Sequence, residues 1–322
     1  PVVKDPKTAA NTSPKFDIGR NFANKIWNAS RFILSHIDEH SESSVQHAKL
    51  TALEDRWILS RLNATIATLE TAINAFHFAE AATALYAFFW TDVCDWYLEI
   101  AKARIKAGDA TVQQVLLHTL ETSLALLHPV MPFVTEEIWS KLPNRKSMLV
   151  TAPWPEPDAN RVDGAVEAQL AMIQAVTSAI REIQNRYPAA RGKSAVLVPH
   201  DEQVRDLIER SRPIIEPLTG VTIVENAVNG AKPADAATAV VTIGAGVRVY
   251  IGGVIDRAAE AATLGKRRDE LKKFIASHQQ KLGNEAFVNK APAQVVQGLR
   301  DQLAKQREEL DAIEQNLADL GP

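Results

Sequence analysis

Two histidines have the spacing of a metal-binding pair. His36 and His40 in "HIDEH" lie one helical turn apart, so both imidazoles could reach one metal ion. The general-base glutamate and third ligand of a zinc peptidase motif are missing, and His47 lies beyond a polar loop. We therefore interpret the pair as a solvated helix end, and we expect no metal and no other cofactor in this chain.

A second group contains the carboxylates Asp92, Asp95 and Glu99, which share one predicted helix near Trp96. Such a group can form a general acid–base pair, but carboxylates on packed helices more often pair with Arg or Lys of a neighbouring helix. The single cysteine, Cys94, lies on the same aromatic helix and is expected to be a small buried residue. We predict no catalytic residue here.

The stretch "GAGVRVYIGG" (244–253) contains the first two glycines of a dinucleotide-binding motif. Val249 occupies the position of the third glycine and no helix is predicted after it, so nucleotide binding is not expected. The chain also has no Walker-type GxxxxGK[ST] sequence.

The first predicted helix combines amide and cationic side chains on the face opposite an apolar stripe. Amides beside Arg and Lys can read base edges while the cations hold phosphates. A solvated face with hydrogen bonds to neighbouring helices explains the pattern equally well. The polar residues are Arg20, Asn21, Asn24, Lys25, Asn28 and Arg31, and the stripe contains Phe22, Ile26 and Ile33.

Composition limits the class of protein. The 322 residues suffice for two or three domains, and the formal net charge of −3 predicts no global attraction to nucleic acid. No apolar run approaches the roughly 20 residues that span a bilayer. The polar N-terminus lacks a signal-peptide pattern, and one cysteine excludes a disulfide framework, so we expect a cytoplasmic protein without a membrane anchor. The first residue is not Met, which suggests a fragment or a processed chain.

Residues 15–142 predict four or five amphipathic helices joined by short turns, which indicates a helical bundle. Gly108 is expected to end one helix, and the two prolines of "HPVMPF" (128–133) end another. Thr135, followed by two glutamates, is expected to cap the next helix. The Pro-rich segment 143–163 predicts a linker or a packed extended strap.

Residues after 163 predict a smaller α+β unit. One helix is expected at about 165–186 and another near 202–210, with β-type runs at 195–199, 221–225 and 239–251.

Residues 254–320 contain two heptad repeats separated by "LGNEAFVNKAP" (282–292), which predicts an antiparallel coiled-coil hairpin. We expect Gly283 to take a left-handed cap and Pro292 to start the second helix. Arg268 and His278 interrupt the apolar seam, which they either weaken or fix in register. Cationic side chains of the hairpin can contact RNA phosphates, or they can serve only solubility and helix pairing. They are Lys266, Arg267, Lys272, Lys273, Lys281 and Lys290.

Several segments of the sequence resemble one protein family. "GRNFANKIWNASRFIL" (19–34), "LEDRWILSRLN" (53–63), "FHFAEAATALYAFFWTDVCDWYLEIAK" (76–102) and "HPVMPFVTEEIWSKLP" (128–143) are similar to the anticodon-binding domain of bacterial valyl-tRNA synthetases. "KLGNEAFVNKAPAQVV" (281–296) resembles the turn of their C-terminal coiled-coil arm. The resemblance runs through almost the whole chain and is weakest at 190–250.

The resemblance implies a mainly α protein whose parent enzyme attaches valine to its tRNA with ATP and Mg²⁺, and edits misactivated threonine. The chain contains no HIGH or KMSKS sequence, so we expect it to lack the catalytic and editing domains and to be inactive alone. It divides into an N-terminal strap (1–14), an anticodon-binding domain (15–160), an α+β connector (161–253) and a coiled-coil arm (254–322).

By resemblance, the partners are a valine-accepting tRNA and the catalytic domain of the same chain, with no DNA and a monomeric state. The "RNxxNKxWN" motif matches the family and adds Trp27 to the candidates for contacting the anticodon. The alternative is that Trp27 lies in the core. The corresponding region of an isoleucyl or leucyl enzyme and a non-RNA coiled-coil module remain alternatives. The isoleucyl enzymes commonly end in a cysteine-bound zinc module, which Cys94 alone cannot supply.

Overall fold

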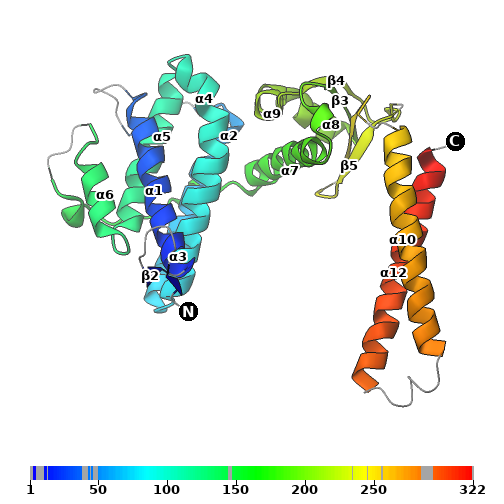
Figure 1. The fold of residues 1–322 in the computed structure, drawn as a ribbon. Helices are drawn as coiled ribbons and strands as arrows, with labels where there is room; N and C mark the ends of the chain where they lie inside the picture. The colour runs from blue at the N-terminus through cyan, green and yellow to red at the C-terminus, as the bar shows by residue number, and fades with distance from the viewer. Residues whose placement is uncertain are drawn as a thin grey trace. The chain divides into compact units, whose positions relative to one another are not determined.

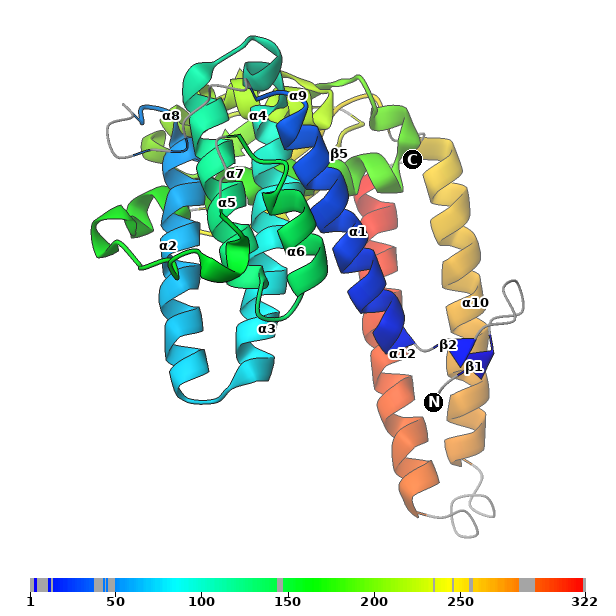
Figure 2. The same cartoon turned by 90° about the vertical axis from the view of Figure 1, so that its left-hand side faces the viewer.

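The computed structural model describes residues 3–4, 11–12, 14–37, 43, 45, 50–143, 147–233, 235–244, 246–254, 257–283 and 293–320. In this part the chain is mainly helical with one four-stranded mixed sheet (Figures 1 and 2), which confirms the predicted fold class. The chain forms two compact units, Pro1–Thr177 with Arg210–Leu218 and Ser178–Glu209 with Thr219–Pro322. The four-part domain division stays a prediction. No described helix is long and apolar enough to cross a membrane.

The first unit is a helical bundle preceded by a short two-stranded sheet. In it, α1 contacts α5, α6 and the segment η1, while α2 packs against α3, α5 and η1. The elements are β1 (Val3–Lys4), β2 (Asn11–Thr12), α1 (Pro14–Leu34), α2 (Leu53–Asn74), α3 (Phe78–Ala87), η1 (Phe88–Tyr97), α4 (Leu98–Lys106), α5 (Ala110–Leu127), α6 (Pro132–Trp139), the 3₁₀ turns η2 (Leu149–Thr151) and η3 (Ala159–Arg161), and the start of α7 (Gly164–Arg186).

Local sequence explains where several of these helices begin and end. Gly108, with φ of 72°, follows the end of α4, as predicted. The Asp109 carboxylate then accepts hydrogen bonds from the backbone N–H groups of Thr111 and Val112 and caps α5. Asp163 caps α7 through the N–H groups of residues 165 and 166 in the same way.

Two predicted helix ends are wrong. α6 begins at Pro132, so Thr135 lies inside the helix and its hydroxyl donates to the carbonyl of Met131 rather than capping an N-terminus. Gly283 is the last residue of α10 and does not have a positive φ, so it is not a left-handed cap. Pro292 lies outside the described residues.

The second unit contains a four-stranded sheet in the order β4-β3-β6-β5. β3 pairs in parallel with β4 and antiparallel with β6, and β6 forms an antiparallel hairpin with β5. The elements are the end of α7, the 3₁₀ turn η4 (Pro188–Ala190), β3 (Ser194–Pro199), α8 (Glu202–Arg210), β4 (Thr222–Asn226), β5 (Ala237–Val241) and β6 (Val247–Ile251); α9 (Arg212–Thr219) lies between α8 and β4 in sequence. These positions confirm the predicted helix near 202–210 and the β-type runs at 195–199 and 221–225, whereas the run at 239–251 is divided into the two paired strands β5 and β6.

The same unit includes two long helices, α10 (Arg257–Gly283) and α12 (Ala293–Leu320), which lie side by side along their length (Figures 1 and 2). Leu271, Ile275 and Ile313 are buried in the seam between them. His278 hydrogen-bonds through Nδ1 to Oε1 of Gln306 on the opposite helix at 2.9 Å, which fits its predicted role in fixing register.

Candidate functional site

The polar face of α1 is exposed because the opposite stripe anchors the helix. Ile26 and Ile33 are completely buried, and the ring of Phe22 lies 4.8 Å from Tyr86 and 6.2 Å from Phe89, measured between centroids. These contacts fix the rotation of α1 about its axis, so its polar side chains project away from the bundle core.

Most of the candidate residues on this face are exposed, and four of them have no hydrogen bond or ion pair among the described residues. Amide and guanidinium groups left without protein partners are free to bond a ligand. These four side chains follow one another at steps of three and four residues along α1: Asn21, Asn24, Asn28 and Arg31.

Two cations of the predicted set have protein partners. Arg20 pairs with Asp17 one turn earlier, at 2.8 Å. Lys25 is half-buried, donates a hydrogen bond to Asp95 of η1 at 2.8 Å, and lies 5.0 Å from the ring centroid of Trp90. Burial alone would lower the pKa of Lys25, but the hydrogen bond and charge of Asp95 outweigh it and raise the pKa. Lys25 therefore contributes to holding α1 against η1.

η1 is a ten-residue π-helix within an otherwise α-helical run, whereas the sequence predicted a regular helix. It presents Asp95 to Lys25 and Asp92 to Arg61 of α2. The side chain of Cys94 is buried, as predicted, and burial raises its pKa to about 12.

The three carboxylates near Trp96 do not form an acid–base pair, because each has a basic partner. Asp92 accepts from Arg61 at 3.0 Å, Asp95 accepts from Lys25, and Glu99 pairs with Lys102. Burial raises the pKa of Asp92 against the opposing charge of Arg61. The prediction that these carboxylates pair with Arg or Lys of a neighbouring helix is confirmed for Asp92 and Asp95, whereas Glu99 pairs with Lys102 on its own helix.

Of the three histidines considered for metal binding, His40 and His47 lie outside the described residues. His36 lies against the carbonyl of Phe32 and the hydroxyl of Ser35 through Nδ1. No cluster of three or more His, Cys, Asp or Glu that could hold a metal ion occurs in the described part of the chain.

An ionic network inside the bundle involves Arg104 of α4. Its guanidinium forms two hydrogen bonds of 2.9 Å with the fully buried Asp55 and one each with Glu54 and Asp109. The Tyr97 hydroxyl donates to the same Asp55 carboxylate at 2.7 Å, and burial next to that charge raises the Tyr97 pKa well above its usual value. Each of the three carboxylates accepts a hydrogen bond from Arg104, so the network links α2, α4 and the start of α5.

Trp27 lines an open pocket of about 380 Å³ at the C-terminal half of α1, and its side chain is 42% exposed. Arg31 and Leu34 continue the wall on α1, while Ile138 and Lys141 contribute the wall near the end of α6. Trp27 is therefore not a core residue. An indole face beside cations is a surface on which a base can stack.

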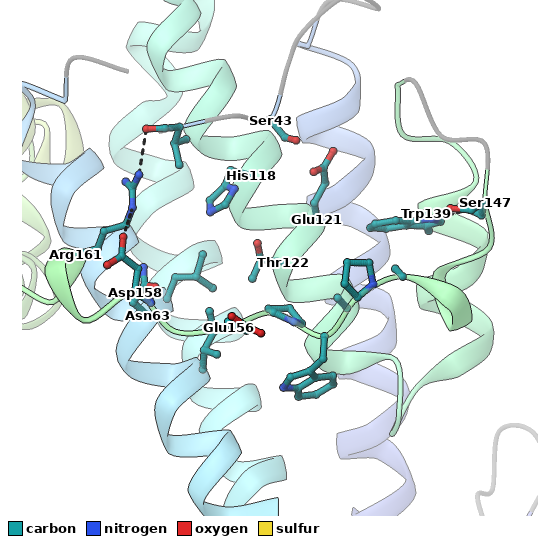
Figure 3. Close-up of a pocket in the computed structure, with 18 of the residues that line it drawn as sticks. Ser43, Asn63, His118, Glu121, Thr122, Trp139, Ser147, Glu156, Asp158 and Arg161 are labelled. Atoms are coloured by element: carbon teal, nitrogen blue, oxygen red, sulfur yellow. Dashed lines mark hydrogen bonds and ion pairs between the residues drawn. The ribbon is translucent and has the colours of Figure 1, made fainter. Parts of the chain in front are cut away.

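A larger cavity of about 650 Å³ lies between α2, α5 and the Pro-rich strap (Figure 3). His118 projects into it from α5, and Arg161 crosses its edge to bond Asp158 and the carbonyl of Val45. Burial and the charge of Arg161 lower the pKa of His118 to about 4, against a hydrogen bond to the backbone of Ser43. The strap itself is held by Asn63, whose side-chain oxygen accepts from the N–H of Asp158. These contacts confirm a packed strap.

Two of the predicted arm cations bridge the hairpin. Arg267 hydrogen-bonds Glu309 at 2.8 Å, and Lys272 pairs with Glu314 at 2.8 Å, so both link α10 to α12. Three others are exposed and have no side-chain partner among the described residues, namely Lys266, Lys273 and Lys281. Lys290 lies outside the described residues.

Exposed residues that the sequence did not single out lie beside these candidates. Phe274 on α10 is about half exposed next to Lys273, and α12 exposes Arg300 and Arg307 without side-chain partners in the described chain. The two arginines are one heptad apart, a signal that could have found them. Lys141, two residues beyond the end of α6, is far from Trp27 in sequence and lies beside it only in the folded structure.

Comparisons with known proteins cover both units. Residues 55–198 match the model of the anticodon-binding domain of tRNA ligase, and residues 256–321 match the valyl tRNA synthetase tRNA binding arm. The valine–tRNA ligase of Listeria innocua is 37% identical over 304 residues, which cover 91% of this chain and 34% of that protein. That of Thermotoga maritima is 35% identical over 312 residues, covering 95% and 34%.

A third relative, the valine–tRNA ligase of Rhodopirellula baltica, is 36% identical and covers 97% of this chain and 32% of its own length. The chain thus spans about a third of the length of the curated relatives it matches. A solved leucyl-tRNA synthetase complex from Agrobacterium radiobacter K84 matches 45% of the chain at 21% identity, with a TM-score of 0.36.

Proposed function

The chain carries the anticodon-binding domain and the tRNA-binding arm of the valyl-tRNA synthetase family, and on this premise we propose that the two parts hold one valine-accepting tRNA at two places. The bundle contacts the anticodon stem-loop, and the coiled-coil arm lies against the outer corner of the same tRNA. Both contacts serve recognition and orientation.

The observation that carries the proposal is the row of unpartnered amide and cationic groups on α1. Asn21, Asn24, Asn28 and Arg31 keep their hydrogen-bonding capacity while the core fixes the helix that holds them. Specific RNA recognition targets unpaired bases, which stack on aromatic rings and bond through their edges. Trp27 supplies such a ring beside Arg31. Arg20 and Lys25 remain candidates, but each must first exchange a carboxylate partner for RNA.

On the arm, we propose that Lys266, Lys273 and Lys281 contact tRNA phosphates, because they are exposed and unpaired in the described structure. Arg267 and Lys272 contribute positive potential, but their side chains form ion pairs with the opposite helix. Lys290 lies outside the described residues and stays a candidate for the same role. These contacts are electrostatic and should weaken steeply as salt increases.

We further propose that the full-length enzyme attaches valine to this tRNA in the cytoplasm, using ATP with Mg²⁺, and that the catalytic residues lie outside this chain. The buried carboxylates of Asp92 and Asp55 are each paired with an arginine, which supports a recognition role without chemistry. We therefore expect no ATP–pyrophosphate exchange with valine from this chain alone.

Binding of the chain to valine tRNA and to a non-cognate tRNA, each at two salt concentrations, tests the proposal. We expect a preference for valine tRNA that Asn24→Ala with Asn28→Ala reduces by about tenfold, since lost base-edge contacts cost roughly 1–3 kcal/mol. Asn160→Ala, at an exposed asparagine away from α1, is the matched control. Absence of binding at low salt would contradict RNA recognition and favour a protein-binding coiled coil. Equal affinity for both tRNAs would leave only nonspecific electrostatic binding.

A further inference from the structure

An open pocket lies at one end of the four-stranded sheet in the second unit. It has a volume of about 640 Å³ and is formed by the ends of β3, β5 and β6 together with the loop after β4. Val198, Arg248 and Val240 are paired across these three strands, so their side chains share one face of the sheet. We call this cavity the sheet-face pocket.

Backbone contacts hold the walls of the sheet-face pocket in place. The N–H of Ala227 donates to a carbonyl of β3 at 3.2 Å, which ties the loop after β4 to the sheet. Gly230 lets this loop approach closely, because a Cβ there would lie 2.9 Å from a methyl group of Val198. On the other side, the N–H of His200 donates to the carbonyl of Gly246 at 3.1 Å and joins the end of β3 to the turn between β5 and β6. The fold of the unit therefore shapes the pocket.

The lining combines an apolar floor with hydrogen-bonding groups that lack partners. The floor consists of valine side chains, of which Val240 is 62% exposed. The side chains of Arg248, His200 and Asn229 have no partner among the described residues. The described lining contains no Asp or Glu, and the nearby Glu225 is not part of it. This combination suits a ligand that has an anionic group for the guanidinium and a flat, largely apolar body for the valines.

The glycines beside the pocket do not make it a dinucleotide-binding site. Gly244 and Gly246 lie in the turn of a β-hairpin, and the strand β6 follows them. A dinucleotide-binding fold instead places the pyrophosphate at the N-terminus of a helix that follows the glycines. An anion in the sheet-face pocket would be held by side chains, chiefly Arg248, as in proteins that bind single-stranded nucleic acid.

The place of the pocket in the chain favours RNA as the source of this ligand. Residues 199–255 lie between the stretches that match the anticodon-binding domain and the tRNA-binding arm, and neither match includes them. The pocket belongs to the same compact unit as α10 and α12. A tRNA held by the arm therefore presents its unpaired nucleotides to this unit at a high effective concentration.

We propose that the sheet-face pocket binds one unpaired nucleotide of the tRNA. Arg248 holds a phosphate, Asn229 and His200 bond to the ribose or to the edge of the base, and the base packs on the valines. This contact is additional to those proposed for α1 and the arm. It rests on the proposed tRNA binding, but on no particular residue of α1.

The affinity of the chain for valine tRNA at constant salt, combined with chemical probing of the 2′-hydroxyl groups of the bound tRNA, tests the pocket. Arg248→Ala removes the phosphate contact, and Val240→Glu puts a carboxylate on the apolar floor at an exposed position. Lys232→Ala is the matched control, because Lys232 is an exposed cation of the same unit outside the lining. Thermal unfolding of each variant checks that the fold is retained.

We expect Arg248→Ala and Val240→Glu each to weaken tRNA binding by about tenfold, and Lys232→Ala to have a clearly smaller effect. One unpaired nucleotide should be protected by the wild-type chain and by Lys232→Ala, but reactive with both pocket variants. Equal losses from Arg248→Ala and Lys232→Ala would leave only diffuse electrostatic attraction and would overturn the proposal. An unchanged protection pattern with both pocket variants would overturn it as well.

Equilibrium dialysis with AMP separates RNA from a free nucleotide as the occupant. Saturable AMP binding that Arg248→Ala abolishes, together with unchanged tRNA binding, would assign the pocket to a free nucleotide and would overturn the RNA contact. Failure of the wild-type chain to bind tRNA at low salt would contradict the proposed function itself. Normal wild-type binding with unaffected pocket variants would contradict only the sheet-face pocket.

Discussion

Lys25 and Asp95, 70 residues apart in sequence, form a 2.8 Å ion pair that joins α1 to the π-helical segment η1. The ammonium group also lies 5.0 Å from the ring centroid of Trp90, so one side chain makes an ionic and a cation–π contact. A lysine on the helix that carries the candidate RNA contacts therefore contributes to positioning that helix.

We expect Lys25→Ala to lower the free energy of unfolding by about 1 kcal/mol, since the ion pair is partly exposed and the cation–π contact adds a similar small amount. Urea denaturation measures this change. Asn28→Ala, on the exposed face, should leave stability within about 0.5 kcal/mol. Because the Lys25 pKa is raised, the contribution should persist at neutral pH and disappear only as the pH rises through that raised pKa. Equal stability of both variants would contradict the anchoring role.

Two neighbouring lysines of the arm have different surroundings. Lys273 is exposed without a side-chain partner in the described residues, whereas Lys272 pairs with Glu314 of the other helix. Lys273→Glu should weaken tRNA binding and reduce the slope of log affinity against log salt by about 1, because one phosphate contact is lost. Helicity should not change, since Lys273 has no side-chain partner in the described residues. Filter binding across a salt series, with circular dichroism on the same samples, measures both effects.

Lys272→Glu is the matched variant one residue away. It replaces the 2.8 Å pair with Glu314 by two like charges and should lower the thermal stability of the arm as well as its positive potential. If Lys272→Glu reduced the slope of log affinity against log salt by about 1 while Lys273→Glu left it unchanged, Lys272 rather than Lys273 would be the phosphate contact.

The sequence predicts the elements whose causes are local. Gly108 and the two prolines of 128–133 set helix ends within a few residues, and the heptads of α10 and α12 predict the hairpin. Periodicity also places Ile26 and Ile33 of α1 in the core. Each of these features depends on the conformational preference or burial of residues close in sequence.

Other features depend on contacts between distant segments. The partner of Lys25 lies on η1, and the wall opposite Trp27 comes from α6. A π-helix has nearly the same apolar spacing as an α-helix, so residues 88–97 gave no separate signal. The positive φ of Phe76 opposes the local preference of a bulky residue, so nothing in the sequence indicated it, although the N–H of Phe76 donates to the carbonyl of Ile73 and closes the C-terminus of α2.

The network around Arg104 should be the least tolerant of substitution in the bundle. Arg104→Ala would leave the fully buried carboxylate of Asp55 without its cation and should destabilise by about 3–5 kcal/mol, measured by urea denaturation. Arg104→Lys should retain only part of the unfolding free energy that Arg104→Ala loses, since an ammonium cannot reproduce the two parallel bonds to Asp55. Lys102→Ala, which removes the exposed pair with Glu99, should cost less than about 1 kcal/mol. Equal losses for Arg104→Ala and Lys102→Ala would contradict this assignment.

His118 should make the stability of the bundle depend on pH. Burial beside Arg161 lowers its pKa to about 4 from the ordinary 6.5, so the unfolded chain binds a proton that the folded protein excludes between these values. The stability of the folded state is unaffected by His118 above pH 6.5 and declines as the pH falls toward 4, by about 3 kcal/mol in all.

Urea denaturation at pH 7 and pH 5 measures this change before most carboxylates titrate. His118→Gln keeps a neutral polar side chain in the cavity and should remove much of the difference in unfolding free energy between the two pH values. His77→Gln, at an exposed histidine near Glu80, should leave the difference as it is. An unchanged pH dependence in His118→Gln would show that another group excludes the proton.

Protonation of His118 in the folded state would also place a cation next to Arg161, at the edge that the strap closes over the cavity. We therefore expect the strap near Asp158 to open first in acid.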